Sequence, residues 1–382
     1  MHENTASEEE DGLGILPGPT ADGSLPAPRQ VFDAWRCPRA GTDNPSRMDN
    51  PVWEWLVRSG ISAYEASRRY GIDVVPPRGP TWCFDRFGRT STTMPDGRII
   101  HIGGEHEDHY DPDFHIYNDV IAVDVDGGIS IFGYSREVFP PTDFHTATLV
   151  GDDLYIIGRL GYPEDRRSRI ESVHVLDTGT YRFRTLPTRG DAPPWLHRHM
   201  AEADLLRRVI RVTEGIHYRE DVPVAIENFG TWELEIDTGT WSLAEMKPWS
   251  QWCFRRETTG HNALWNIRQM LWTASVGWVD EHRQDRERLI PMLGPGAEPE
   301  RIEALYSVPI PHAALESRDD EHAAHRIVVE GVTVRYVEGM FALAMTVEGE
   351  LPDEVIGVLV EDLRGKLSKI EGHAYRAERI PH

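Results

Sequence analysis

Cysteine is scarce in this sequence, which holds only Cys37, Cys83 and Cys253. Three thiols that lie far apart predict neither a disulfide framework nor a zinc site built from thiolates. Long apolar runs are also missing, because no stretch of about 18 residues is apolar enough to span a bilayer. The start of the chain lacks the basic segment and apolar centre of a secretion signal. We therefore expect a cytoplasmic protein without a membrane partner.

Basic residues are outnumbered, since 40 Lys and Arg face 63 Asp and Glu and the net charge is -23. Affinity for nucleic acids depends on Lys and Arg that neutralise phosphates, so no nucleic-acid partner is expected. Residues 55–74 resemble the first half of a DNA-binding helix-turn-helix, but no basic recognition helix follows them. DNA binding is therefore the least favoured of the functions considered. The motifs of serine hydrolases, P-loop enzymes and dinucleotide-binding enzymes are absent as well.

The chain divides into regions of different texture. Residues 1–30 are rich in Glu, Gly and Pro and are expected to form a disordered tail. Residues 31–86 predict a helical cap, in which Asn50 precedes Pro51 and Ser62 opens a capping box. Residues 87–250 have short apolar runs between turns, which is typical of an all-β fold. We predict a helix and an irregular linker over 251–325, and a small α+β unit with the order β-β-α-β over 326–382.

The β region repeats itself. The segment DTGTY at Asp177–Tyr181 recurs as DTGTW at Asp237–Trp241. The run from His145 to Gly158 overlays the run from Thr90 to Gly103, and His199 opens a third, degraded copy. A repeat of about 50 to 60 residues with four strands in each copy predicts the blades of a β-propeller.

These repeats resemble those of the kelch family of β-propellers. The likeness is carried by RIIHIGG with YNDVIAVD, and by FHTATLVGDDLYIIG with SVHVLD and TGTYRF. It implies a mainly β fold of kelch-like β-propeller blades with an N-terminal helical cap and a small C-terminal α+β unit. Only three blades are recognisable, whereas a closed propeller needs at least about four. Diverged C-terminal blades could complete the ring, two chains could close it as a homodimer, or the sheets could pack openly.

One loop concentrates potential ligands. The stretch IIHIGGEHEDHYDPDFHIYNDV at 99–120 holds eight His, Asp and Glu residues within eleven positions. In a blade this loop emerges on the face where first strands begin, and His145 and His199 stand at such starts. We therefore predict a metal site for Fe(II) or Zn, since imidazole and carboxylate suit both ions. The predicted ligands are His106, Glu107, Asp111, His115, His145 and His199.

The same loop supplies a second resemblance. Glu107, Asp111 and His115 follow the spacing E-x-x-x-D-x-x-x-H, which resembles the iron-binding motif of the plant kelch specifier proteins. The alternative is a solvated loop with no ligand, since surface loops rich in acids are usually hydrated.

Two functions follow from these observations. The first is a kelch-like propeller protein that binds a small molecule or a protein partner at its loop-rich face, with or without a divalent metal in the funnel. The second is a metal-dependent lyase, isomerase or oxygenase that acts on a small polar substrate, with Asp108 moving protons. The unpaired sheet edges require a cover. We expect the C-terminal unit to pack there or to form a homodimer through the helix face of Ile356, Leu363 and Ile370.

Overall fold

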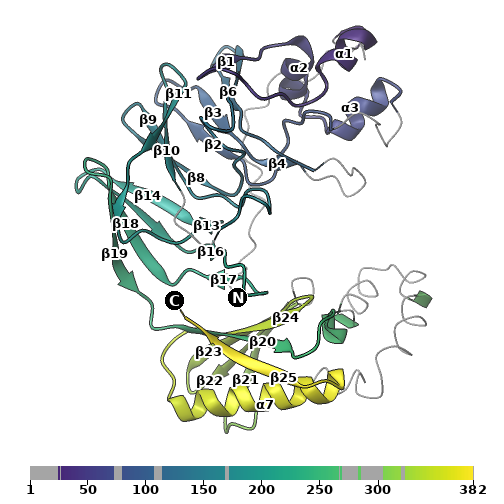
Figure 1. Ribbon diagram of the computed structural model, residues 1–382, viewed down its shortest axis with the longest axis vertical. Coiled ribbons are helices and arrows are strands. Elements are labelled where there is room, and N and C mark those ends of the chain that lie inside the picture. The colour runs from purple at the N-terminus through teal and green to yellow at the C-terminus, as the bar shows by residue number, and fades with distance from the viewer. Residues whose placement is uncertain are drawn as a thin grey trace. The chain divides into compact units, whose positions relative to one another are not determined.

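The chain folds into two compact units (Figure 1). Unit 1 comprises Met1–Gly215 and Trp232–Leu243, and unit 2 comprises Ile216–Thr231 and Ala244–His382. The computed structural model describes residues 25, 27–72, 80–106, 114–167, 172–265, 267–268, 283–284, 304–319 and 323–381. Within these residues the fold is mainly β, and the helices are all too short or too polar to cross a bilayer.

Three helices precede the sheets of unit 1: α1 (Arg29–Trp35), α2 (Pro51–Ser59) and α3 (Ala63–Arg69). Asn50 begins α2 as the sequence predicts, because its side chain accepts hydrogen bonds from the backbone N–H groups of Val52 and Trp53. Ser62 does the same for α3 through the N–H of Glu65. The apolar faces of the helices pack against the first sheet, so these segments belong to the core of unit 1.

The described part of unit 1 contains three larger sheets, each built on four antiparallel strands that lie in the sheet in their chain order. Each sheet is an up-and-down arrangement with its first strand at one edge, and none of the sheets closes on itself. The strands are β2 (Thr90–Thr93), β3 (Ile99–Ile102), β6 (Val120–Val123) and β7 (Ile129–Gly133); β8 (Thr146–Val150), β9 (Asp153–Ile157), β10 (Val173–Asp177) and β11 (Arg182–Leu186); and β14 (Met200–Asp204), β15 (Val209–Thr213), β18 (Gly230–Glu235) and β19 (Thr240–Met246). Two short strands extend the sheets, β1 (Ser46–Arg47) beside β7 and β12 (Arg189–Gly190) beside β19.

The first strands of the three sheets begin side by side. The backbone N–H of Phe144 donates to the Gly88 carbonyl at 2.8 Å, and that of Arg198 donates to the Phe144 carbonyl at 2.8 Å. All three residues have positive φ, and the Arg198 guanidinium lies 4.1 Å above the Phe144 ring. The left-handed conformation is uncommon for Phe and Arg, and here it turns each chain segment into the start of its strand.

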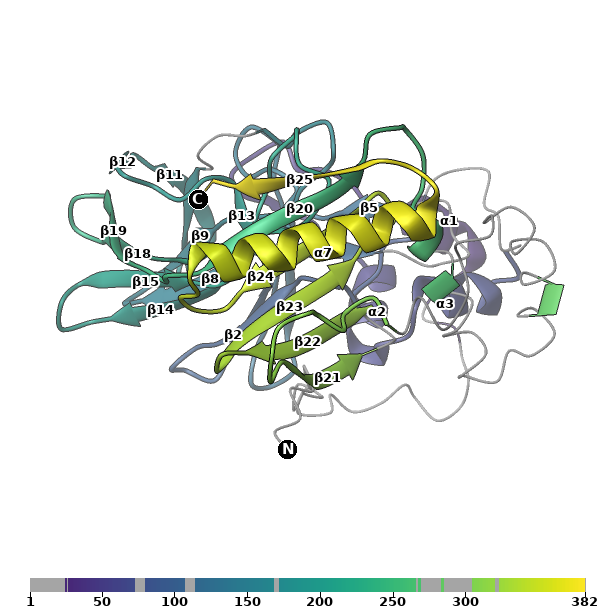
Figure 2. The same ribbon diagram turned by 90° about the horizontal axis from the view of Figure 1, so that it is seen from below.

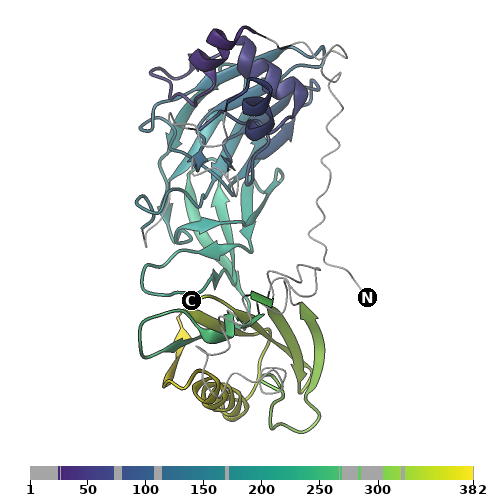
Figure 3. The same cartoon turned by 90° about the vertical axis from the view of Figure 1, so that its right-hand side faces the viewer.

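Unit 2 is one six-stranded antiparallel sheet in the order β21-β22-β23-β24-β20-β25 with the long helix α7 (Asp353–Glu371). Figure 2 shows α7 running lengthwise along the sheet, and Figure 3 shows it nearly end-on beside one face. A hairpin of β16 (Ile216–His217) and β17 (Ile226–Glu227) belongs to the same unit. The strands of the sheet are β20 (Ser250–Arg256), β21 (Ala314–Asp319), β22 (Ala324–Val329), β23 (Val332–Glu338), β24 (Ala342–Val347) and β25 (Tyr375–Ile380).

Unit 2 is larger than the small unit predicted over 326–382. β20 pairs with both β24 and β25, and β21 pairs with β22, so two further strands belong to this sheet. Leu264 and Ile267, which belong to the helix predicted within 251–325, lie in its core. Pairing between strands far apart in the chain leaves no local pattern, which explains the difference. Leu363 and Ile370 of α7 pack in the same core, so the helix face suggested for a dimer is occupied within the unit.

Candidate functional site

The first and last residues of the loop rich in His, Asp and Glu form the two strands of a short hairpin. β4 (Glu105–His106) pairs with β5 (His115–Ile116), and His106 stands opposite His115. Opposite residues of antiparallel strands have Cβ atoms roughly 4.5–5.5 Å apart, so the two imidazoles are neighbours. Glu107 and Asp111 lie outside the described residues.

His145 and His199 occupy equivalent places before β8 and β14. The Nε2 atom of His145 lies 3.0 Å from Thr90 Oγ1, and that of His199 lies 2.9 Å from Thr146 Oγ1. Each bond joins a histidine to the first strand of the preceding sheet. Burial, with the nearby His199, lowers the pKa of His145 to about 3, so this imidazole is neutral at pH 7. Both histidines thus connect neighbouring sheets.

The predicted ligands therefore form two pairs, one in the hairpin and one at the strand starts. Within the part of the chain that the structure describes, no three His, Cys, Asp or Glu side chains gather as a metal site would require. A metal at this loop remains a prediction, because a third ligand would have to come from Glu107 or Asp111.

A buried ion pair that the sequence did not reveal lies beside the hairpin. Arg86 donates to Asp119 through Nη1 at 2.5 Å and through Nη2 at 3.0 Å. The Trp82 indole N–H donates to the same carboxylate at 2.9 Å. The Arg86 guanidinium carbon lies 3.4 Å from the centre of the Tyr117 ring. Bidentate pairing and this stacking fix all four side chains in one arrangement.

Above this ion pair is a pocket of about 240 Å³, which we call the Tyr162 pocket. Trp82, Tyr117 and Asp119 are among the residues that line it, together with residues from several other segments that are distant in the chain. The Tyr162 hydroxyl accepts a hydrogen bond from the N–H of Ile116 at 2.9 Å, which holds β5 against the loop after β9. The remaining lining residues are Pro38, Arg39, Ala40, His115, Ile116, Asn118, Arg136, Pro141 and Glu164.

The lining of the Tyr162 pocket includes both charged and neutral groups. Burial first, and then the nearby Arg86, lowers the pKa of His115 to about 4. Its imidazole is therefore neutral at pH 7 and can both donate and accept a hydrogen bond. Arg136 pairs with Asp165 and lies 5.6 Å from the centre of the Tyr162 ring. The pocket thus combines guanidinium, carboxylate, phenol and imidazole groups.

A second buried carboxyl group of unit 1 belongs to Asp143, and Arg166 and Arg159 are near enough to act on its charge. Asp143 is completely buried, and its Oδ1 atom accepts from the N–H of Gly161 at 2.7 Å. The Glu105 side chain lies within hydrogen-bonding reach, and burial raises the pKa of Asp143. Two acids this close favour a shared proton. Asp143 lies two residues before His145 in the sequence, and this is the one signal that could have identified it.

The surroundings of Cys83 favour the thiol over the thiolate. Burial raises the pKa of its thiol, and the Sγ atom donates to the Asp85 carbonyl at 2.9 Å. A thiol held in its protonated form is a weak nucleophile. In that segment the residue that takes part in the candidate site is Arg86.

Comparison with models of known protein families finds no match, and comparison with curated proteins finds none either. The resemblance to kelch repeats therefore rests on the repeated segments of the chain itself.

Proposed function

We propose that unit 1 is an open, kelch-like arrangement of three blades that binds a small polar molecule in the Tyr162 pocket. Three observations support the blades: four antiparallel strands that lie in chain order in each sheet, adjacent first strands, and equivalent His–Thr bonds between sheets. The pocket carries the functional part of the proposal, because Asp119 in its lining is held by Arg86 and Trp82 while the other lining residues come from segments that are distant in the chain.

The lining indicates which molecules would bind. Arg39 and Arg136 offer guanidinium groups that suit a carboxylate, and Glu164 offers an acceptor for an ammonium or hydroxyl group. Asp119 is already satisfied by Arg86. The ligand class that fits this set is a small amino acid or hydroxy acid, which carries both kinds of group.

This proposal predicts a selective loss of binding in the Arg136→Gln variant. A panel of amino acids and 2-hydroxy acids would be screened by saturation-transfer NMR. At least one should bind the unaltered chain, and the variant should bind it about tenfold more weakly, because a charge-assisted hydrogen bond is lost. Arg184→Gln is the matched control, since Arg184 also pairs with an acid on the surface of unit 1. Equal binding by both variants, or no binding by the unaltered chain, would contradict the proposal.

A second candidate is the metal-dependent enzyme, and the pairing of His106 with His115 favours it. These two imidazoles would hold a divalent ion together with Glu107 or Asp111. Bound Fe(II) or Zn would supply Lewis-acid chemistry beside the Tyr162 pocket, which His115 also lines.

Metal titration tests this candidate. We expect the unaltered chain to bind one Zn²⁺ or Fe(II), and His106→Ala and His115→Ala to lose it, since incomplete coordination abolishes binding. His261→Ala replaces an exposed histidine of unit 2 and should leave binding unchanged. His145→Ala separates the two versions of the site: retained metal would confine the ion to the hairpin. One equivalent of metal on the His106→Ala variant would exclude the candidate.

A further inference from the structure

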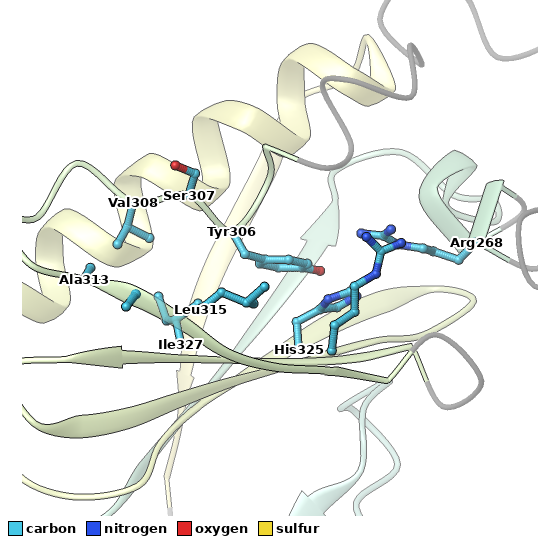
Figure 4. A pocket seen from close by; sticks show the side chains of 10 residues that line it. Arg268, Tyr306, Ser307, Val308, Ala313, Leu315, His325 and Ile327 are labelled. Atoms are coloured by element: carbon cyan, nitrogen blue, oxygen red, sulfur yellow. The ribbon is translucent and has the colours of Figure 1, made fainter.

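Unit 2 contains a pocket of its own, about 220 Å³ in volume, which we call the Tyr306 pocket. It lies where the segment before β21 passes over β22. Figure 4 shows Arg268, Tyr306 and His325 gathered at one end and Val308, Leu315 and Ile327 toward the other. The pocket is therefore polar at one end and apolar at the other.

The polar end rests on a buried carboxylate. Glu338 accepts from Arg268 Nε at 2.9 and 3.1 Å and from the Tyr306 hydroxyl at 2.5 Å. His325 Nε2 lies 3.7 Å from the same carboxylate. Arg268, His325 and Glu338 are at most 3% exposed, and Tyr306 is 7% exposed. Four polar side chains are thus withdrawn from water at one point.

Stacked rings keep this arrangement rigid. The Tyr306 ring stacks on the His325 ring and on the Tyr336 ring, with 4.6 Å between ring centres in each pair. Stacking fixes the direction of the Tyr306 hydroxyl and of the imidazole before any ligand arrives. A preorganised polar group costs less to use in binding than one that must be ordered.

Stability alone does not account for such a group. Replacing a buried ion pair with apolar residues of similar volume is often neutral or stabilising, so a fold gains little from it. Here the pair borders a cavity instead of being sealed in the core. Among the described lining residues there are two guanidinium groups, Arg268 and Arg318, and no carboxylate. Glu338, which is bonded to Arg268, is not among these lining residues.

We propose that the Tyr306 pocket binds a small carboxylic acid with an aliphatic tail. The carboxylate would lie at the end formed by Arg268, Arg318 and His325, and the tail would run along Val308, Leu315 and Ile327. Guanidinium groups are suited to carboxylates, and the apolar wall gains from excluding water along the tail. This site is separate from the one in unit 1 and does not depend on the function proposed there.

Three probes test the two halves of the ligand by isothermal titration of the full chain. Hexanoate carries both halves, hexan-1-ol lacks the charge, and acetate lacks the tail. Hexanoate should bind at least about tenfold more tightly than either of the others. Failure of hexanoate to bind, or equal affinity for hexanol, would overturn the proposal.

Variants locate the binding. Arg318→Gln removes one positive charge and leaves the bonds of Glu338 with Arg268 and Tyr306 in place, and it should weaken hexanoate binding about tenfold. Arg326→Gln is the matched control, because Arg326 is exposed on β22 and points away from the face that carries His325 and Ile327. Arg184→Gln in unit 1, where Arg184 lines neither pocket, should leave hexanoate binding unchanged. Equal weakening by Arg326→Gln, or none by Arg318→Gln, would contradict the assigned site.

Discussion

Replacing Asp119 with alanine should lower the free energy of unfolding of unit 1 by about 3–5 kcal/mol, the usual cost of leaving a buried charge without its partner. Arg86, which has no exposed side-chain surface, would keep its charge among Trp82 and Tyr117 with no counter-ion. The Trp82 N–H would lose its acceptor as well. Urea unfolding followed by tryptophan fluorescence measures the loss, and Trp82 reports on the site directly.

The control for this prediction is Asp153→Ala, which breaks the pair between Asp153 and Arg184 at 2.7 Å. Half of the Arg184 side chain is exposed, so water replaces the lost partner and the loss should stay below about 1 kcal/mol. Similar losses in the two variants would show that the Arg86 pair is not structurally important.

Gly103→Ala should also be strongly destabilising, with a loss of about 3 kcal/mol or more in the free energy of unfolding. Gly103 has a φ of 58°, and a Cβ atom there would lie 2.1 Å from the carbonyl oxygen of Thr142. The backbone before β8 would have to move, and His145 would move with it. Thermal or urea unfolding of the purified variant measures the loss.

Gly151→Ala separates the two causes of that loss. Gly151 has nearly the same φ, 62°, but a Cβ atom there would meet nothing within 4 Å. This variant should lose only the cost of the left-handed backbone, about 1 kcal/mol. An equal loss at the two positions would mean that the close approach of Thr142 to Gly103 does not contribute to the free energy of unfolding.

Much of unit 1 could be predicted because its information is local. Strands that follow one another pair with one another, so alternating apolar residues and the repeated DTGT turns were enough to indicate four strands in a copy. The same turn lies between β10 and β11, where Asp177 Oδ1 accepts from the N–H groups of Gly179 and Thr180. His145 and His199 were correctly placed at strand starts, but their bonds to Thr90 and Thr146 were not foreseen.

The sites depend on contacts that the sequence does not display. Arg86 and Asp119 are 33 residues apart, and Arg268 and Glu338 are 70 apart. Nothing in either segment marks one residue as the partner of the other, because ordinary surface charges look the same in a single sequence. The Tyr306 pocket was missed for this reason. The metal site was predicted from a dense local cluster of His, Asp and Glu residues. The central residues of that cluster lie outside the part of the chain that the structure describes.

The position of β20 in its sheet has a consequence for synthesis on the ribosome. β20 lies between β24 and β25, yet it is translated before either of them. At ordinary elongation rates the 119 residues from Arg256 to Tyr375 take roughly 6–24 s to make, and β20 has an unpaired edge throughout. Each sheet of unit 1 can form as soon as its own strands emerge. In the nascent chain β20 therefore exposes Cys253 and Phe254, which are buried in the folded protein, and its free edge can pair with a wrong strand. We expect chaperones to protect the chain at β20.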